Sequence, residues 1–126
     1  MNFISTNKSA PAIGPYSQAV NLGDMIFTSG QIPLKPDGSL IDGDIVEQTK
    51  QVLTNLSAVL EEGGSSLQSV VKTTIFLANI EDFAQVNKVY AEFFGSHKPA
   101  RSTIAVKGLP LNVQIEIEVI AVKEQK

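Results

Sequence analysis

The strongest constraint on the fold is a strict alternation of residue types between positions 113 and 122. Every second position holds an aliphatic residue: Val113, Ile115, Ile117, Val119 and Ala121. Because successive side chains of a β-strand point to opposite faces of a sheet, the pattern predicts a strand with one buried face. The intervening positions mix polar and large aliphatic side chains: Gln114, Glu116, Glu118, Ile120 and Val122. A fully solvated face seldom carries such apolar groups, so the second face is also expected to meet protein.

Two amphipathic helices are predicted, one before and one after a segment rich in β-branched residues at 70–77. The first begins at Asp44, which is followed three residues later by Glu47 in the spacing of a capping box, and it ends at Gly63-Gly64. The second extends from about Asp82 to Phe94 and stops at the following glycine. Each helix has one apolar stripe, so each is expected to bury a single face.

Strands are predicted around these helices, in the order strand, strand, helix, strand, helix, strand, strand. Their expected ranges are 19–21, 25–29, 70–77, 101–106 and 113–122, with a further short strand at 2–5. Leu22-Gly23-Asp24 is a hairpin signal, and the last two strands flank a loop that contains Gly108 and Pro110. The pattern predicts an α+β fold in which two helices cover one face of a mixed sheet. The other face would then meet another subunit in a closed, symmetric oligomer.

Composition limits the classes of protein to consider. The 126 residues suit one domain, 1–126, and 43% of them are apolar, which is enough for a buried core. A net charge of −3 gives no attraction to a phosphate backbone, so nucleic acid is not the expected partner. The absence of cysteine excludes disulfides, thiolate metal ligands and a cysteine nucleophile. No apolar run approaches a membrane span and no signal peptide is visible, so a cytoplasmic protein without a membrane partner is expected.

Two residues on the last two predicted strands could form a site for an anion and an acid. Glu116 lies between Ile115 and Ile117, and burial there would raise its pKa and make it a candidate acid or base. An exposed glutamate is an equally weighted alternative, and Glu118 on the same face is a rival. Arg101 carries a planar guanidinium that suits two-point contact with a carboxylate ligand. Pattern alone favours the alternative that Arg101 is a surface residue paired with one of the two glutamates.

Other positions give weaker signals. In Thr28-Ser29-Gly30-Gln31, glycine would let the backbone approach a ligand, although an ordinary turn explains the segment more simply. Tyr16 and Asn87 could reach a ligand, or they could be a half-buried aromatic residue and a solvent-facing polar residue. His97 is the only histidine, and with no second histidine and no cysteine a zinc site is not expected. No role is assigned to His97.

Five segments in register, spread over nearly the whole chain, resemble the reactive intermediate deaminase family, also called YjgF or Rid. They are Gly14-Pro15-Tyr16-Ser17-Gln18-Ala19, Phe27-Thr28-Ser29-Gly30-Gln31-Ile32-Pro33, Asn87, Pro99-Ala100-Arg101-Ser102-Thr103 and Ile115-Glu116-Ile117-Glu118. No single motif is specific, whereas the order and spacing of all five are. The resemblance implies a chorismate-mutase-like α+β fold and a homotrimer. In that trimer, three sheets form a central barrel and the ligand clefts lie at the subunit interfaces.

The resemblance also implies an activity. The archetype of the family hydrolyses 2-iminopropanoate and 2-iminobutanoate, which arise from enamines released by pyridoxal-phosphate-dependent dehydratases, to 2-keto acids and ammonia. It needs no metal or cofactor. By position, Arg101 would hold the substrate carboxylate, and Glu116 would position and activate a water or shuttle the proton. The backbones of Gly30 and Thr103 would contact the ligand or that water. Three further side chains, the first from the neighbouring subunit, would line the cleft: Tyr16, Ser29 and Asn87.

Some questions stay open at this point. Many members of the family have cysteine at the position of Thr103, so thiol-dependent chemistry is excluded here. The sequence does not fix the side chain of the preferred substrate. Four apolar residues could border the cleft, although the sequence does not place them there: Ile4, Ile32, Phe83 and Leu111. The main alternative function is a non-catalytic module that binds small acids and regulates an enzyme or a transcription factor. A chaperone or ribonuclease role is another alternative, although the acidic balance disfavours RNA cleavage.

Overall fold

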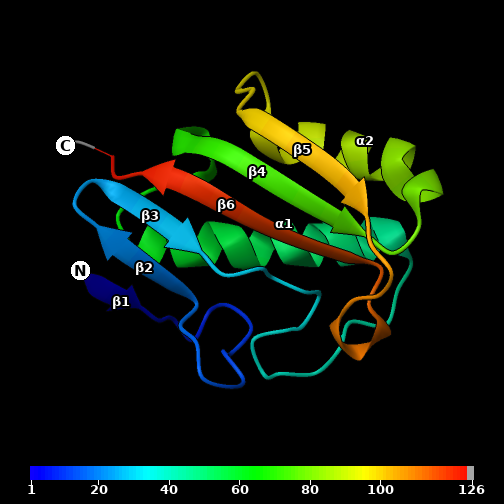
Figure 1. Ribbon diagram of the computed structural model, residues 1–126, viewed down its shortest axis with the longest axis horizontal. Helices are drawn as coiled ribbons and strands as arrows, with labels where there is room; N and C mark the ends of the chain where they lie inside the picture. Colours follow the sequence, from blue (N-terminus) through cyan, green and yellow to red (C-terminus); the bar gives the residue numbers. More distant parts are fainter. Residues whose placement is uncertain (125–126) are drawn as a thin grey trace.

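The computed structural model describes residues 1–124, which form one six-stranded sheet with both long helices on the same face (Figure 1). The strands are β1 (Asn2–Ile4), β2 (Ala19–Leu22), β3 (Met25–Thr28), β4 (Val70–Leu77), β5 (Ala100–Ala105) and β6 (Ile115–Val122). The helices are α1 (Ile45–Glu62) and α2 (Phe83–Phe94), and short 3-10 turns lie at Leu67–Ser69, Ile80–Asp82 and Pro110–Asn112. The predicted α+β class is confirmed. No helix in this part of the chain combines the length and the apolar character that crossing a membrane requires.

The sheet is mixed, as predicted, and β6 is one of its central strands. The strand order is β1-β2-β3-β6-β4-β5, and of these pairs β4–β5 is parallel while the others are antiparallel. A parallel pair needs a long crossover, and the segment with α2 supplies it between β4 and β5. Because β6 pairs with β3 on one side and with β4 on the other, it joins the two parts of the sheet.

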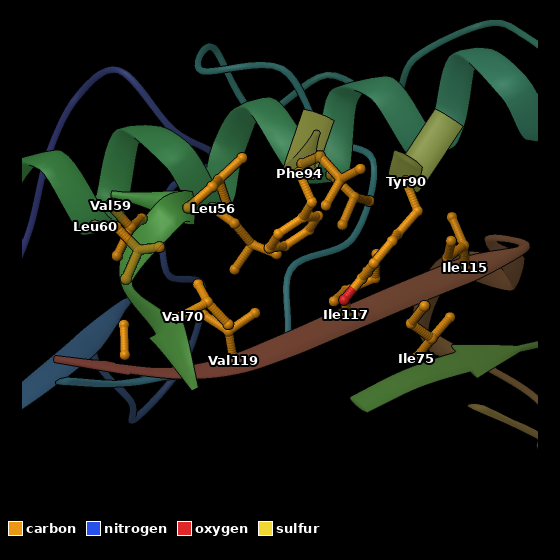
Figure 2. Packing of buried hydrophobic residues seen from close by; sticks show 14 of the residues in the cluster. Leu56, Val59, Leu60, Val70, Ile75, Tyr90, Phe94, Ile115, Ile117 and Val119 are labelled. Atoms are coloured by element: carbon orange, nitrogen blue, oxygen red, sulfur yellow. The ribbon is translucent and has the colours of Figure 1, made fainter. Parts of the chain in front are cut away.

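The alternation in β6 has the predicted consequence for the core. Its odd-numbered residues are at most 2% exposed and pack beneath the helices: Ile115, Ile117, Val119 and Ala121. Leu56 and Leu60 of α1 and Tyr90 and Phe94 of α2 meet them from the helical layer (Figure 2). Complete burial of one such side chain contributes about 1.5–3 kcal/mol, so this layer is the main source of stability.

The ends of the helices follow the predicted signals closely. The Asp44 carboxylate accepts a hydrogen bond from the Glu47 N–H at 3.0 Å and caps the start of α1. Gly64, just beyond α1, has a φ of +84°, which glycine adopts far more easily than other residues. α2 begins at Phe83, one residue later than predicted, because a 3-10 turn precedes it.

Five of the six strands differ from the predicted ranges by one or two residues, and β1 and β3 each end one residue earlier than predicted. The hairpin turn consists of Gly23 and Asp24, and Leu22 belongs to β2. β6 begins at Ile115, because a 3-10 turn occupies the preceding segment. β5 lies one residue earlier than predicted. None of these shifts changes which residues share a face, because the alternation along each strand is unchanged.

Several apolar side chains are exposed on the sheet face opposite the helices. Phe3 of β1 is 73% exposed, Phe27 of β3 is 37% exposed and Ile104 of β5 is 47% exposed. The register places Phe76 of β4 between Ile104 and Glu116, so Glu116 lies on this same face. Exposed apolar surface on a sheet is typical of a face that binds another chain.

Candidate functional site

Arg101 lies near the start of β5 with its guanidinium on the side of the sheet that the helices cover. Its carbon Cζ is 4.9 Å from the centre of the Tyr90 ring and 5.4 Å from the centre of the Phe83 ring, both in α2. The Tyr90 hydroxyl is in turn 3.0 Å from the hydroxyl of Thr73, the residue paired with Arg101 in β4. A guanidinium that interacts with aromatic rings rather than with a carboxylate keeps N–H donors available, so Arg101 can bind an anion.

No carboxylate neutralises this guanidinium within residues 1–124. The one ion pair found there joins Lys50 and Glu47 at 3.9 Å, on the surface of α1. The alternative that Arg101 pairs with Glu116 or Glu118 is therefore not found. An arginine held on aromatic rings without an internal partner is typical of a site for an external carboxylate.

Two polar atoms near Arg101 are buried without a hydrogen-bond partner among the described residues. They are Oδ1 of Asn87, in α2, and Oγ1 of Thr103, two residues after Arg101 and on the same face of β5. An unsatisfied buried polar group costs about 1–3 kcal/mol, so such groups are rare outside sites that hold a ligand or water. We call Arg101, Asn87 and Thr103 the arginine cluster. Asn87 and Arg101 line a cleft of about 450 Å³, which Lys98 also borders.

Glu116 lies on the opposite face of the sheet. Partial burial raises the pKa of its carboxyl group above the usual range, and the negative charge of Glu118 raises this pKa further. A carboxyl group with a raised pKa holds its proton at higher pH than an ordinary glutamate, which suits a group that accepts a proton and later returns it. The burial that was one of two alternatives for Glu116 is therefore found, and Glu118 is the more exposed of the two glutamates.

Gly30 allows the Glu116 carboxyl group to pack against the backbone. A Cβ atom at Gly30 would lie 2.8 Å from Cδ and 3.0 Å from Cγ of Glu116, which is too close for any side chain. The neighbouring Gln31 fixes this contact, since its N–H donates to the Ile117 carbonyl at 2.8 Å and its carbonyl accepts from the Ile117 N–H at 3.1 Å. From the sequence, glycine here could let the backbone approach a ligand. In the structure, the absence of a side chain at Gly30 makes room for the Glu116 carboxyl group.

Substituting Gly30 with alanine is expected to displace the Glu116 carboxyl group and to destabilise the protein by roughly 1 kcal/mol, the lower end of the usual cost of overpacking, because the displaced group is the end of a flexible side chain. Gly108→Ala is the matched control, because a Cβ at Gly108 would meet no atom within 4 Å. Thermal unfolding followed by circular dichroism measures both variants. Equal melting temperatures for Gly30→Ala and Gly108→Ala would contradict the packing described for Glu116.

Tyr16 and Ser29 lie on the Glu116 side. Tyr16 is 51% exposed, its hydroxyl accepts from the Ile13 N–H at 3.3 Å, and it lines a hollow together with Gly30. The Ser29 hydroxyl donates to the Ser17 carbonyl at 2.6 Å, so its proton is already engaged. Tyr16 is therefore available to a ligand. The Ser29 side chain instead holds its own loop against the segment that contains Ser17. We call Glu116, Gly30 and Tyr16 the glutamate cluster.

One chain does not bring the two clusters together. The arginine cluster lies under α2 at the outer strand β5, and the glutamate cluster lies on the other face of the sheet, where β4 separates β5 from β6. The sequence predicted the members of both clusters but not this separation. It also missed Tyr90 as a support for Arg101, although its spacing of seven residues from Phe83 on one helix face is a readable signal.

His97, to which the sequence assigned no role, makes a structural contact. Its ring atom Nε2 is 2.7 Å from the Val70 carbonyl oxygen, which ties the loop after α2 to the start of β4. The residues in the described range 1–124 include no group of three or more histidine, aspartate or glutamate side chains arranged to hold a metal ion.

The fold and its two clusters define a class: two-layer α+β proteins with a guanidinium-lined cleft at the edge of a mixed sheet. Residues 7–123 match the sequence profile of the family described as endoribonuclease L-PSP. The 2-iminobutanoate/2-iminopropanoate deaminase of Escherichia coli is 46% identical to this chain, over 95% of this chain and 96% of the relative.

Solved structures agree with this match. The Thermotoga maritima protein TM0215 has a TM-score of 0.96 at 56% sequence identity, and the match covers 99% of both chains. Escherichia coli TdcF, solved with bound serine, has a TM-score of 0.94 at 42% identity, covering 98% of this chain and 100% of TdcF. The chain therefore belongs to the endoribonuclease L-PSP family, which is the YjgF or Rid family that its motifs predicted.

Proposed function

We propose that this protein is an enamine/imine deaminase that hydrolyses 2-iminopropanoate and 2-iminobutanoate to 2-keto acids and ammonia. The observation that carries the proposal is the arginine cluster, in which an unpaired, ring-stacked guanidinium lies near two unsatisfied buried oxygens. Its cleft of about 450 Å³ is large enough for an acid of this size. The proposal includes a single cytoplasmic domain, residues 1–126, that needs no cofactor.

The proposed active site is completed by a second copy of the chain. In a homotrimer with a chorismate-mutase-like central barrel, the exposed sheet faces of three chains meet. The arginine cluster of one chain would then face the glutamate cluster of its neighbour. The exposed Phe3, Phe27 and Ile104 support this assembly, because contact with another chain would bury them. The separation of the two clusters in one chain supports it independently.

In the proposed reaction, Arg101 binds the substrate carboxylate through two hydrogen bonds and fixes the imine carbon beside Glu116. Glu116 accepts a proton from water as the water oxygen bonds to that carbon, and the C=N bond becomes a C–N single bond. Glu116 then returns the proton to the nitrogen, which becomes an –NH3+ group. As the C–N bond breaks and ammonia leaves, Glu116 takes the proton of the new hydroxyl group, so that the C=O bond forms, and passes this proton to the departing ammonia. The raised pKa of Glu116 suits these transfers, which contribute roughly 10²–10⁴-fold. A protonated imine is already electrophilic, so its hydrolysis needs no further activation.

A coupled assay tests the function. The purified protein is added to a pyridoxal-phosphate-dependent serine or threonine dehydratase, and keto acid is measured against time. We expect the rate of keto-acid formation to rise in proportion to the protein added, because the protein would hydrolyse the released intermediate faster than the intermediate decays in water by itself. An unchanged rate at every protein concentration would refute the deaminase. Light scattering on the same sample tests the assembly, and a monodisperse monomer at micromolar concentration would refute the shared site.

A non-catalytic module that binds small acids is the second candidate. The related TdcF was solved with bound serine, which supports recognition of a small carboxylate. The same guanidinium and the same cleft would serve this purpose. Calorimetry that shows tight binding of 2-oxobutanoate, together with no acceleration in the coupled assay, would favour this candidate over the enzyme.

A further inference from the structure

A second hollow, of about 260 Å³, is lined by Tyr16 and Gly30 of the glutamate cluster. Its wall is mostly apolar, with contributions from three separate segments: Ile13, Tyr16, Ile32, Leu34, Pro110 and Leu111. Gly30 is also part of this wall, and the carboxyl group of Glu116 packs against Gly30. Glu116 does not itself line the hollow, but the hollow adjoins it through Gly30. Of its lining residues, Ile32 and Leu111 are two that could border the cleft on the sequence alone.

The backbone at the rim of this hollow has an unusual conformation. Leu111 has φ +56° and ψ +22°, and Asn112 also has φ +56°. Asparagine adopts this left-handed conformation at moderate cost, whereas leucine does so rarely. The turn is held by hydrogen bonds from the Asn112 N–H to the Leu109 carbonyl at 3.1 Å and from the Val113 N–H to the Pro110 carbonyl at 3.2 Å. Backbone conformations of this kind concentrate at functional sites.

The left-handed backbone of Leu111 leaves its side chain exposed at the hollow. Leu111 is 64% exposed, so burial in the core does not explain its placement, and yet it forms part of the wall of the hollow. Pro110 limits the freedom of the same turn, because its ring fixes φ. The loop thus presents a large aliphatic group to any molecule that occupies the hollow.

We infer that this hollow receives the aliphatic side chain of the 2-imino acid, and that Leu111 determines the preference for longer and branched side chains. The inference rests on the proposed function. An apolar cavity of about 150 Å³ already holds a benzene-sized molecule, so a hollow of about 260 Å³ exceeds what a methyl or ethyl group can fill. A four-carbon branched side chain, as in 2-imino-4-methylpentanoate, would contact Leu111, Ile13 and Ile32, whereas the methyl group of 2-iminopropanoate would not reach Leu111.

The test compares two substrates in two variants. Leu111→Gly removes the side chain and keeps the backbone, because glycine adopts φ +56° without strain. Ile80→Ala is the control, since Ile80 is also exposed, at 51%, and lines neither cleft. The wild type is expected to prefer 2-imino-4-methylpentanoate over 2-iminopropanoate in kcat/KM. Leu111→Gly should lower this preference about 10-fold, the usual effect of one lost apolar contact, and Ile80→Ala should leave it unchanged.

A binding measurement separates this inference from the proposed function. Calorimetry with 4-methyl-2-oxopentanoate and pyruvate should show the same loss of preference in Leu111→Gly. If no imine is hydrolysed but this loss is seen, the deaminase fails and the role of Leu111 stands. If the wild type hydrolyses both imines and neither ratio changes, the role of Leu111 is overturned. Leu111→Lys is a second variant in case the first is unstable, and its charge at the rim should change both ratios in the same direction.

Discussion

Arg101→Ala is expected to lower kcat/KM for 2-iminobutanoate by at least about 100-fold, because losing the hydrogen-bonded partner of a charged group costs about 3 kcal/mol or more. The melting temperature should change little. The side chain of Arg101 is exposed, and its stacking on Tyr90 and Phe83 contributes only about 0.5–1 kcal/mol. Steady-state kinetics on the imine, together with thermal unfolding, measure both effects.

Arg101→Lys sharpens this test. Lysine keeps the positive charge but loses the planar fork that binds a carboxylate at two points and stacks on two rings. We expect an activity between those of the wild type and Arg101→Ala. Relative to the wild type, Arg101→Lys should lose more activity toward the imino acid than toward its amide, because the amide has no carboxylate for Arg101 to bind. Full activity in Arg101→Ala would show that the guanidinium does not hold the substrate.

Mixing two inactive variants is expected to restore activity. Glu116→Gln keeps the shape of the side chain but cannot take up a proton from water, so it should lose roughly 10²–10⁴-fold in kcat. In a trimer whose sites combine Arg101 of one chain with Glu116 of the next, every mixed trimer of Arg101→Ala and Glu116→Gln has one site with both residues intact. Random reassembly of equal amounts should therefore recover about one quarter of wild-type activity.

The controls are the two variants refolded separately by the same procedure, and each should stay inactive. Recovery should also depend on exchange of chains, so mixing without unfolding should restore activity only as fast as trimers dissociate. The refolded mixture could stay inactive while the wild type recovers fully after the same treatment. In that case the arginine cluster of one chain and the glutamate cluster of the next do not form one active site. This result would refute the shared active site even if each residue alone proved essential.

The elements of the fold could be predicted from local patterns. The alternation from Val113 to Val122 fixed the two faces of β6, and Asp44 with Glu47 located the start of α1. Both features depend only on residues a few positions apart, so a short stretch of sequence is enough to predict them. The same alternation along β6 placed Glu116 on the face away from the core.

The position of Arg101 relative to Glu116 could not be predicted in this way. Each lies on a strand whose alternation is readable, but the register of β4 with both strands decides whether they share a face. That register depends on long-range pairing, which no short segment encodes. The left-handed conformation of Leu111 is hidden for a different reason, because a leucine in a loop normally has negative φ and the residue type at position 111 does not signal the exception.

The arrangement of β6 has a consequence for protein engineering. Ile115 and Ile117 are completely buried on one side of this strand, and Glu116 projects between them from the other. Any change of volume beneath α1 that shifts the strand by a fraction of an ångström must also shift the carboxyl group. Attempts to raise thermostability by redesigning the interior should therefore alter turnover as well, and libraries screened for heat resistance alone would collect slow enzymes.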